Sequence, residues 1–153
     1  MLRGSVEITD LLTPDRVIAA LRVNDKAQLL TELARRASGP AGIPASAIRE
    51  AVETRERLGS TGVGAGIAIP HAQIAGLDSF YGLFVRLARH IDYDAVDGRP
   101  VDLVFLLLIP TNNKQHLQAL ACISRRLRDQ TVANELRRAK DAREIHEVLT
   151  EKP

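Results

Sequence analysis

The segment that most constrains this chain is a glycine-rich stretch running from Arg55 to His71. Four glycines fall within residues 59–66, and glycine lets the backbone adopt positive φ and approach a ligand closely. The apolar residues 67–69 predict a short buried strand, which Pro70 is expected to end because proline cannot donate to a sheet ladder. His71 is therefore predicted at the carboxyl end of a strand, beside a loop rich in exposed N–H groups.

A helix is predicted just before this stretch, over residues 44–58. Arg55 follows Ile48 by seven residues and Val52 by three, so it shares their apolar face, whereas Arg57 does not. A guanidinium that points inward is costly unless an anion pairs with it, although its stem can also pack on the core while the head reaches water. Arg55 is thus a candidate ligand for an anion.

The rest of the chain alternates helical and extended patterns. Helices are predicted over residues 24–37, 44–58, 112–128, 130–139 and 142–150, and strands over 67–69, 80–87 and 101–109. A leading turn or helix is expected over 5–12, residues 16–21 fit either a strand or a helical turn, and residues 72–79 are expected to form a loop. These elements predict an α/β (α+β) fold, a three-layer sandwich with helices on both faces of a small mixed sheet, in one domain over residues 1–153.

Composition argues against several classes of function. The formal net charge is only +2 and aromatic residues are 3%, so neither a basic surface nor a base-stacking platform for nucleic acid is indicated. No apolar run reaches the ~18 residues of a membrane span, and no secretory leader is recognised. The single cysteine, Cys122, is predicted to be a buried thiol in a reducing compartment, which favours the cytoplasm.

Two of the four histidines are predicted at junctions between elements. His71 follows a strand, and His116 lies in the first turn of the helix 112–128; such junctions are where α/β sheets place ligands. His90 and His146 are predicted to be solvated surface residues, His90 in a loop. The inward face of the helix 112–128 is predicted to consist of Leu117, Leu120, Ala121, Ser124 and Leu127.

Several kinds of site fit the sequence poorly. Two histidines without Asp, Glu or Cys at ligand spacing are weak support for zinc, so no metal and no cofactor is expected. Ser60 lacks the Gly-x-Ser-x-Gly context of a hydrolase nucleophile. The glycine stretch has no Gly-Lys-Ser/Thr, and it leads into a strand rather than opening a helix, unlike nucleotide-binding loops.

What remains is an imidazole near an arginine, hydroxyls, N–H donors and a second histidine. That set suits a phosphoryl group carried on histidine, which adds a charge of about −1.5 to −2. Arg55, with the donors of Ser60, Thr61 and Gly62, would stabilise it. His116 would donate a hydrogen bond, and the end of its helix would add partial positive charge.

Residues 54–71, from Thr-Arg-Glu-Arg-Leu-Gly-Ser-Thr-Gly to Ile-Ala-Ile-Pro-His, resemble the signature of the mannitol/fructose-type IIA domains (EIIA type 2) of the bacterial phosphotransferase system. They are closest to the nitrogen-regulatory branch. The apolar run 101–110 and the later His116-Leu117 resemble the family's second block. The resemblance covers about residues 6–150 and implies a mixed, roughly five-stranded sheet between helical layers.

The resemblance also implies that His71 accepts phosphate from the histidine-phosphocarrier protein of the nitrogen-type cascade. The family's arginine precedes the phosphorylated histidine by sixteen residues, and 71 − 16 = 55 selects Arg55 rather than Arg57. His116 matches the family's second active-site histidine. Ala72-Gln73 departs from the family's usual glycine and basic residue, which bears on loop shape and partner contacts.

Two functions follow from the resemblance. In the first, phosphorylation is a switch that controls regulated target proteins such as a kinase, a transporter or a sensor. In the second, a sugar-specific IIA component of the fructose/mannitol type passes its phosphate to a IIB domain for sugar uptake. A zinc hydrolase is a distant third hypothesis. Neither nucleic-acid binding nor direct membrane insertion is expected.

Overall fold

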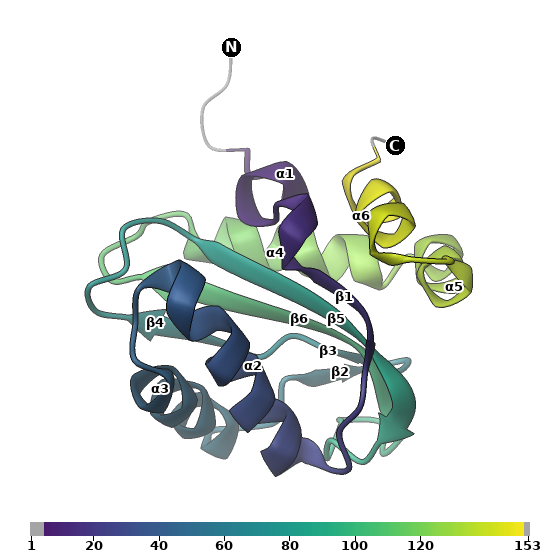
Figure 1. Ribbon diagram of the computed structural model, residues 1–153, viewed down its shortest axis with the longest axis horizontal. Helices are drawn as coiled ribbons and strands as arrows, with labels where there is room; N and C mark the ends of the chain where they lie inside the picture. The colour runs from purple at the N-terminus through teal and green to yellow at the C-terminus, as the bar shows by residue number, and fades with distance from the viewer. Residues whose placement is uncertain (1–4, 152–153) are drawn as a thin grey trace.

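The computed structural model describes residues 5–151, so the predicted domain over residues 1–153 extends beyond the described part at both ends (Figure 1). In chain order its elements are α1 (Ile8–Leu11), the 3₁₀ turn Pro14–Arg16, β1 (Val17–Leu21), α2 (Lys26–Ala41), α3 (Ala45–Arg57), β2 (Gly62–Gly64), β3 (Ile67–Ala68), β4 (His71–Ile74), β5 (Tyr81–Ile91), β6 (Val101–Pro110), α4 (His116–Leu127), α5 (Gln130–Arg138) and α6 (Ala142–Thr150).

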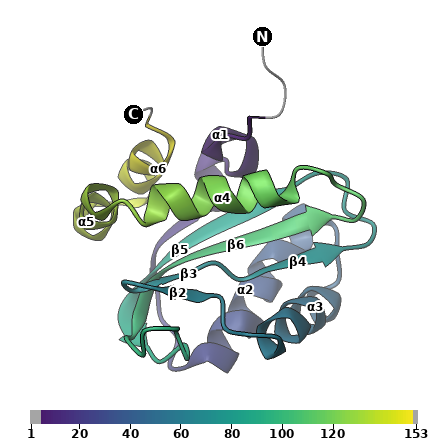
Figure 2. The ribbon, with the colours of Figure 1, turned by 180° about the vertical axis from the view of Figure 1, so that it is seen from behind.

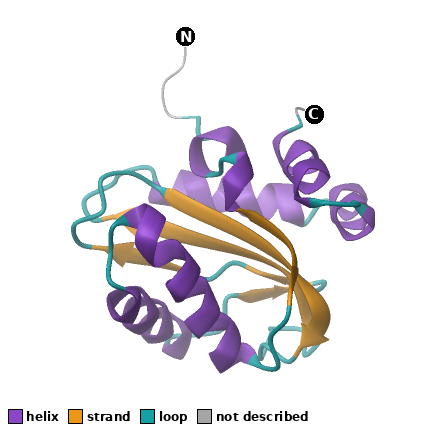
Figure 3. Cartoon of the chain, viewed as in Figure 1, coloured by secondary structure: helices purple, strands orange, loops and turns teal. Residues whose placement is uncertain are grey.

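The strands form one mixed sheet in the order β1-β5-β6-β3-β2, with β4 also paired to β6 (Figure 3). β6 is antiparallel to β5 and parallel to both β3 and β4. Ile67 pairs with Leu103 and His71 pairs with Leu107, so β3 and β4 lie end to end beside β6. Six strands therefore occupy five positions across the sheet, and the predicted mixed sheet is confirmed.

Helices cover both faces of this sheet. α2 and α3 pack on one face, and α1, α4, α5 and α6 lie on the other; Figure 2 shows α4 above the strands, with α2 and α3 below them. Because side chains alternate along a strand, Leu106 and Leu108 of β6 join the first core, while Leu107 and Ile109 join the second. All ten residues of β6 are buried, as expected for a central strand covered on both faces. The predicted three-layer sandwich is confirmed.

Side-chain caps mark the starts of the last two helices where the sequence predicts them. The Asp129 carboxylate accepts from the N–H groups of Thr131 and Val132, and the Asp141 carboxylate accepts from that of Glu144. Each carboxylate satisfies backbone donors that have no partner within the helix.

The predicted end of the first long helix at Ala37 is wrong. α2 continues to Ala41 with Pro40 inside its last turn. The left-handed residue that ends the helix is Gly42, with φ of 71°, and its N–H donates to the carbonyl of Ser38 at 2.9 Å. The chain thus stops where a glycine can adopt the required conformation rather than at the proline.

The strand assignments around the glycine-rich stretch also need correction. Residues 72–79 are not all loop, because His71 opens the short strand β4 instead of following the carboxyl end of a strand. Pro70 interrupts the ladder, but its carbonyl accepts from the N–H of Leu107 at 3.0 Å and keeps the chain beside β6. Pairing with β6 therefore resumes at once. Residues 16–21, left open by the sequence, contain the strand β1.

The predicted inward face of the helix after Pro110 is partly wrong: Leu127 is buried and Leu120 is half-buried, but Leu117 and Ala121 are exposed. α4 begins only at His116, and its buried residues are Ala119, Cys122, Ile123 and Leu127. These positions follow the i, i+3, i+4 spacing of one helical face. Leu117, predicted to point inward, is 70% exposed, because it shares with the exposed Ala121, four residues on, the face of α4 that points away from the core.

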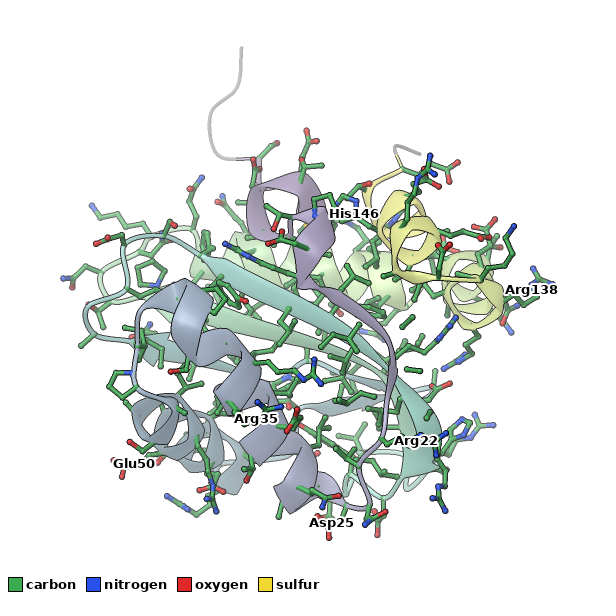
Figure 4. All side chains as sticks on the ribbon, viewed as in Figure 1. Arg22, Asp25, Arg35, Glu50, Arg138 and His146 are labelled. Carbon is green, nitrogen blue, oxygen red and sulfur yellow. The ribbon has the colours of Figure 1, made fainter. Side chains whose placement is uncertain are left out.

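The two remaining histidines differ from each other. His90 is exposed as predicted, but it belongs to β5 rather than to a loop, and its Nε2 lies 3.5 Å from the Asp102 carboxylate. His146 is half-buried, and its Nε2 lies 3.3 Å from the carbonyl of Leu12 between α6 and α1 (Figure 4). The prediction of a solvated His146 is therefore wrong, because α1 packs against its helix.

Candidate functional site

The ring of His71 is held in one orientation by its own backbone. Its Nδ1 lies 2.8 Å from the carbonyl oxygen of Ile69, and since a carbonyl only accepts, Nδ1 carries the proton. The other nitrogen, Nε2, is then left with its lone pair. Ala72 and Ile74 join the core under α2 and α3, so His71 points to the α4 side of the sheet. The half-buried ring therefore keeps the lone pair of Nε2 free of a hydrogen bond to its own backbone.

The structure brings Arg55 and His116 close to this ring. Burial lowers the pKa of His71 below its ordinary value, although the hydrogen bond to Ile69 opposes the change. The positive charge of Arg55 and the neighbouring His116 lower that pKa further, while Glu56 raises it. Because the effect of a charge on a pKa falls with distance, the three predicted catalytic residues lie in the same region of the molecule.

Arg55 and Arg57 lie on different faces of α3, as predicted. Arg55 is half-buried, and its guanidinium donates to the carbonyl of Gly59 at 2.9 Å. Arg57 is exposed and donates to the hydroxyl of Thr54 at 3.1 Å. The Arg55 head is thus tethered where the glycine-rich stretch begins, at a residue whose φ of 152° suits glycine.

His116 is the first residue of α4. Its Nδ1 lies 3.1 Å from the carbonyl of Asn113, so this ring too has its Nε2 left for a ligand. Asn112 adopts a left-handed φ of 68° in the turn before the helix, a conformation that asparagine tolerates better than most residues. In Figure 2 this end of α4 and β4 lie on the same side of the molecule.

The predicted phosphate ligands are engaged within the protein. The Ser60 hydroxyl donates to the carbonyl of Tyr93 at 3.3 Å and accepts from the N–H of Gly62 at 3.0 Å. The N–H of Thr61 donates to Glu56 at 3.1 Å, and its hydroxyl also binds that carboxylate. A phosphate would have to replace these partners, and the role of the three residues stays a prediction.

Glu56 is the residue that the sequence reasoning missed. Its buried carboxylate accepts from the ammonium of Lys26 at 2.8 Å and from the hydroxyl of Tyr93 at 3.0 Å, besides Thr61. Burial alone would raise its pKa, but Lys26 and Thr61 outweigh burial and hold that pKa below the ordinary value. Glu56 lies four residues after Val52, so helical spacing carried a signal for its inward position.

A chain of hydrogen bonds links Glu56 to the orientation of His71. Glu56 holds Thr61, the carbonyl of Thr61 accepts from the N–H of Ile69 at 3.0 Å, and the carbonyl of Ile69 accepts from His71. Glu56 is therefore a positioning residue for the imidazole, acting through two backbone groups rather than by contact with a ligand.

Two large apolar side chains near the site are exposed. Leu58 is 82% exposed just after α3, and Leu117 is 70% exposed beside His116. Leu58 follows Arg55 by three residues and Leu117 directly follows His116, so each lies close in the chain to a predicted site residue.

Within residues 5–151, no group of three or more His, Cys, Asp or Glu side chains is placed to hold a metal ion. The helices of the same part of the chain include none that is long and apolar enough to cross a membrane.

Comparison with known proteins gives consistent matches. The family model described as "Phosphoenolpyruvate-dependent sugar phosphotransferase system, EIIA 2" matches residues 10–152. A nitrogen regulatory protein of Bradyrhizobium diazoefficiens is 49% identical over 147 residues, covering 95% of this chain and 96% of its own. The crystal structure of the nitrogen regulatory protein IIA-Ntr from Neisseria meningitidis superposes with a TM-score of 0.89 at 31% identity, covering 94% of this chain and 99% of that one. The mannitol IIA of Escherichia coli, at 18% identity and a TM-score of 0.76 over 90% of this chain and 98% of its own, shares the fold.

Proposed function

The chain belongs to the EIIA 2 family of the phosphoenolpyruvate-dependent phosphotransferase system, and on that premise we propose that it is a phosphocarrier that accepts a phosphoryl group on Nε2 of His71. The observation that carries the proposal is the hydrogen bond from Nδ1 of His71 to Ile69, which leaves Nε2 as the nucleophilic nitrogen. The depressed pKa keeps the imidazole neutral, and therefore nucleophilic, near neutral pH.

The transfer itself asks little beyond positioning and charge stabilisation. The nitrogen–phosphorus bond of a phosphohistidine donor breaks as the Nε2 lone pair of His71 forms a new bond to phosphorus. The phosphorylated ring keeps its proton on Nδ1, where the Ile69 carbonyl stabilises it. Arg55 would stabilise the negative charge of the moving phosphoryl group, and His116 would do so when both of its ring nitrogens carry a proton, because its Nδ1 proton is already engaged with Asn113.

The proposed donor is the histidine-phosphocarrier protein of the nitrogen-type cascade. The exposed Leu58 and Leu117, close in the chain to Arg55 and His116, offer apolar contacts for a transient docking surface. We propose the cytoplasm as the location, where the single cysteine, Cys122, would remain a thiol.

The nitrogen-regulatory role is preferred over sugar uptake because the proteins called nitrogen regulatory match nearly the whole chain at higher identity than the mannitol component. In this role the phosphorylation state of His71 controls the binding of target proteins. A pull-down with unphosphorylated and phosphorylated protein should recover different partners. Transfer of the phosphate to a sugar-specific IIB domain at a comparable rate would favour the sugar-uptake alternative instead.

The acceptor is tested by incubation with the phosphorylated carrier protein. The wild-type protein should take up one acid-labile phosphoryl group, with a ³¹P signal typical of Nε2-phosphohistidine. His71→Ala should take up none, whereas the matched control His90→Ala should be labelled normally. Labelling of His71→Ala would refute the assignment.

A further inference from the structure

A second candidate site lies beside β3, the strand that precedes β4 and His71 along the edge of β6. The structure contains a cavity of about 620 Å³ there, which we call the basic cavity. Its walls come from the turn between β2 and β3, the residues just before β6, the end of α4 and the helix α5, which lie together at one side of the molecule in Figure 2. Volumes of this size are typical of pockets for small molecules.

Every charged residue among the described residues lining the basic cavity is basic. They are Arg99, Arg128 and Arg137, and His90 lines it as well. Gln130 and Asn134 add amide groups, while the apolar part of the wall includes Ile67 and Leu127. Arginine binds carboxylate and phosphate groups through paired hydrogen bonds, so this lining suits an anion.

The arginine in the inner wall is rigidly placed. Arg137 makes two hydrogen bonds of 2.9 Å to the buried carboxylate of Asp102 and a third, also 2.9 Å, to the carbonyl of Ala65. A side chain at Gly66 would collide with both partners, because its Cβ would lie 2.5 Å from Arg137 and 2.9 Å from Asp102. Glycine at this position therefore allows the ion pair to reach the cavity wall.

The backbone of the same wall is held in an unfavourable conformation. Ala65 has a left-handed φ of 58°, which costs energy for a residue with a Cβ. Its N–H donates to Asp97 at 3.0 Å and its carbonyl accepts from Arg137, so contacts from two other elements fix it. Backbone strain that the surroundings enforce in this way is common at ligand-binding sites.

Three acidic groups lie near the basic ones, and each already has hydrogen-bond partners within the protein. Asp102 is paired with Arg137, Asp97 accepts from backbone N–H groups of Ala65 and Arg99, and Asp129 caps α5. Arg99 and Arg128 are both exposed, and no ion pair to either is found among residues 5–151. Their guanidinium groups remain available to a ligand.

We propose that the basic cavity binds a small molecule carrying two or more negative charges, as phosphate or carboxylate groups. The basic cavity is separate from the proposed phosphorylation site. Ile67 in its wall and His71 pair with residues of β6 that are four positions apart, which corresponds to about 13 Å along the strand. Binding can therefore be measured on the unphosphorylated protein, independently of the role of His71.

The test follows backbone amide signals by NMR at physiological salt, with sodium pyrophosphate and citrate as separate probes. Wild-type protein should show saturable shifts centred on Gly66, Ile67 and Ala133. The double variant Arg99→Gln/Arg128→Gln should bind both probes at least about tenfold more weakly than wild type. The matched control Arg22→Gln/Arg138→Gln removes the same charge from exposed positions outside the lining, both labelled in Figure 4, and should bind normally.

A steric variant keeps the test independent of charge. Asn134→Phe fills the cavity from an exposed position on α5 and should abolish the shifts with all three arginines retained. A response to one probe only identifies phosphate or carboxylate as the recognised group. The proposal is overturned if neither probe gives saturable shifts, if the two double variants lose binding equally, or if Asn134→Phe binds as well as wild type.

Discussion

Two buried carboxylates have different hydrogen-bond partners; one lies near His71 in β4, and the other lies at the basic cavity beside β3. Glu56, near His71, is held by the ammonium of Lys26 and by neutral donors from Thr61 and Tyr93. Asp102, at the basic cavity, is held by the two-pronged guanidinium of Arg137. The first arrangement passes orientation on to His71, whereas the second fixes a wall. In both places a buried carboxylate with all its partners holds its neighbours in place. Near His71 this orients an imidazole ring, and at the cavity it fixes a guanidinium in the wall.

The largest expected effect is the loss of the Arg137–Asp102 pair. Arg137→Ala leaves a buried carboxylate unpaired and should lower the free energy of unfolding by about 3 kcal/mol, at the low end for a buried pair because Arg137 is 33% exposed. Urea denaturation measures this. The neighbouring control Arg138→Ala should change little. Phosphoryl uptake by folded Arg137→Ala should stay normal, and a loss of uptake would break the proposed separation of the two sites.

The next effect concerns Glu56. Glu56→Gln removes the charge that holds Lys26 and leaves polar groups mismatched, which should cost about 2 kcal/mol of stability. Unlike Arg137→Ala, it should also slow phosphoryl uptake, because Thr61 and Ile69 no longer hold the His71 ring as firmly. The control Glu53→Gln, in an exposed pair with Arg49, should do neither. Normal uptake kinetics in Glu56→Gln would remove Glu56 from the positioning role.

Glu56 also predicts a pH dependence of stability. Its pKa in the folded protein lies below the ordinary value of about 4.5, so its stabilising contribution is complete above that pH. The contribution is lost as the pH falls through the depressed pKa. The difference in unfolding free energy between wild type and Glu56→Gln should therefore shrink below about pH 4.5, in denaturation curves measured across that range.

A smaller effect is expected at Tyr93. Tyr93→Phe removes the hydroxyl that donates to Glu56, at a cost of about 1 kcal/mol. Tyr81→Phe, at a buried ring that packs under Arg16, is the matched control and should be nearly neutral. Thermal melts of the two variants measure the difference, and equal melting temperatures would show that this hydrogen bond adds nothing to the Glu56 cluster.

The smallest effect is a shift in the titration of His71. Since the charge of Arg55 lowers the pKa of His71, Arg55→Gln should raise it toward the ordinary value, as followed by NMR of the ring protons. Arg57→Gln, on the exposed face, should leave that pKa where it is. In wild type, phosphoryl uptake should fall as the pH drops through the depressed pKa, because a protonated Nε2 has no lone pair. Equal shifts in both variants would contradict the different placement of the two arginines.

Much of this arrangement could be predicted because its signals are local. Arg55 shares a helical face with Ile48 and Val52, and the structure buries half of it while Arg57 is exposed. Asp129 and Asp141 cap the helices predicted to follow them. Periodicity misled at α4, where Leu117 and Ala121 fit an apolar stripe as well as the buried Ala119 and Ile123 do. A helix with apolar residues at so many successive positions has several apolar faces, and only packing selects one.

By itself, the sequence indicated the family and the mixed sheet between helices, and it proposed the trio of His71, Arg55 and His116 as a site. The family and the sheet depend on patterns and motifs that are continuous in the chain, whereas His116, far from the other two in the chain, belongs to the trio through its position at a junction and the resemblance to the family. Only the tertiary structure decided that Glu56 holds Tyr93, that Arg137 reaches Asp102, and that basic side chains surround a cavity. Those pairs are separated by 37 and 35 residues, and their contact depends on how separate elements pack, which no local periodicity encodes.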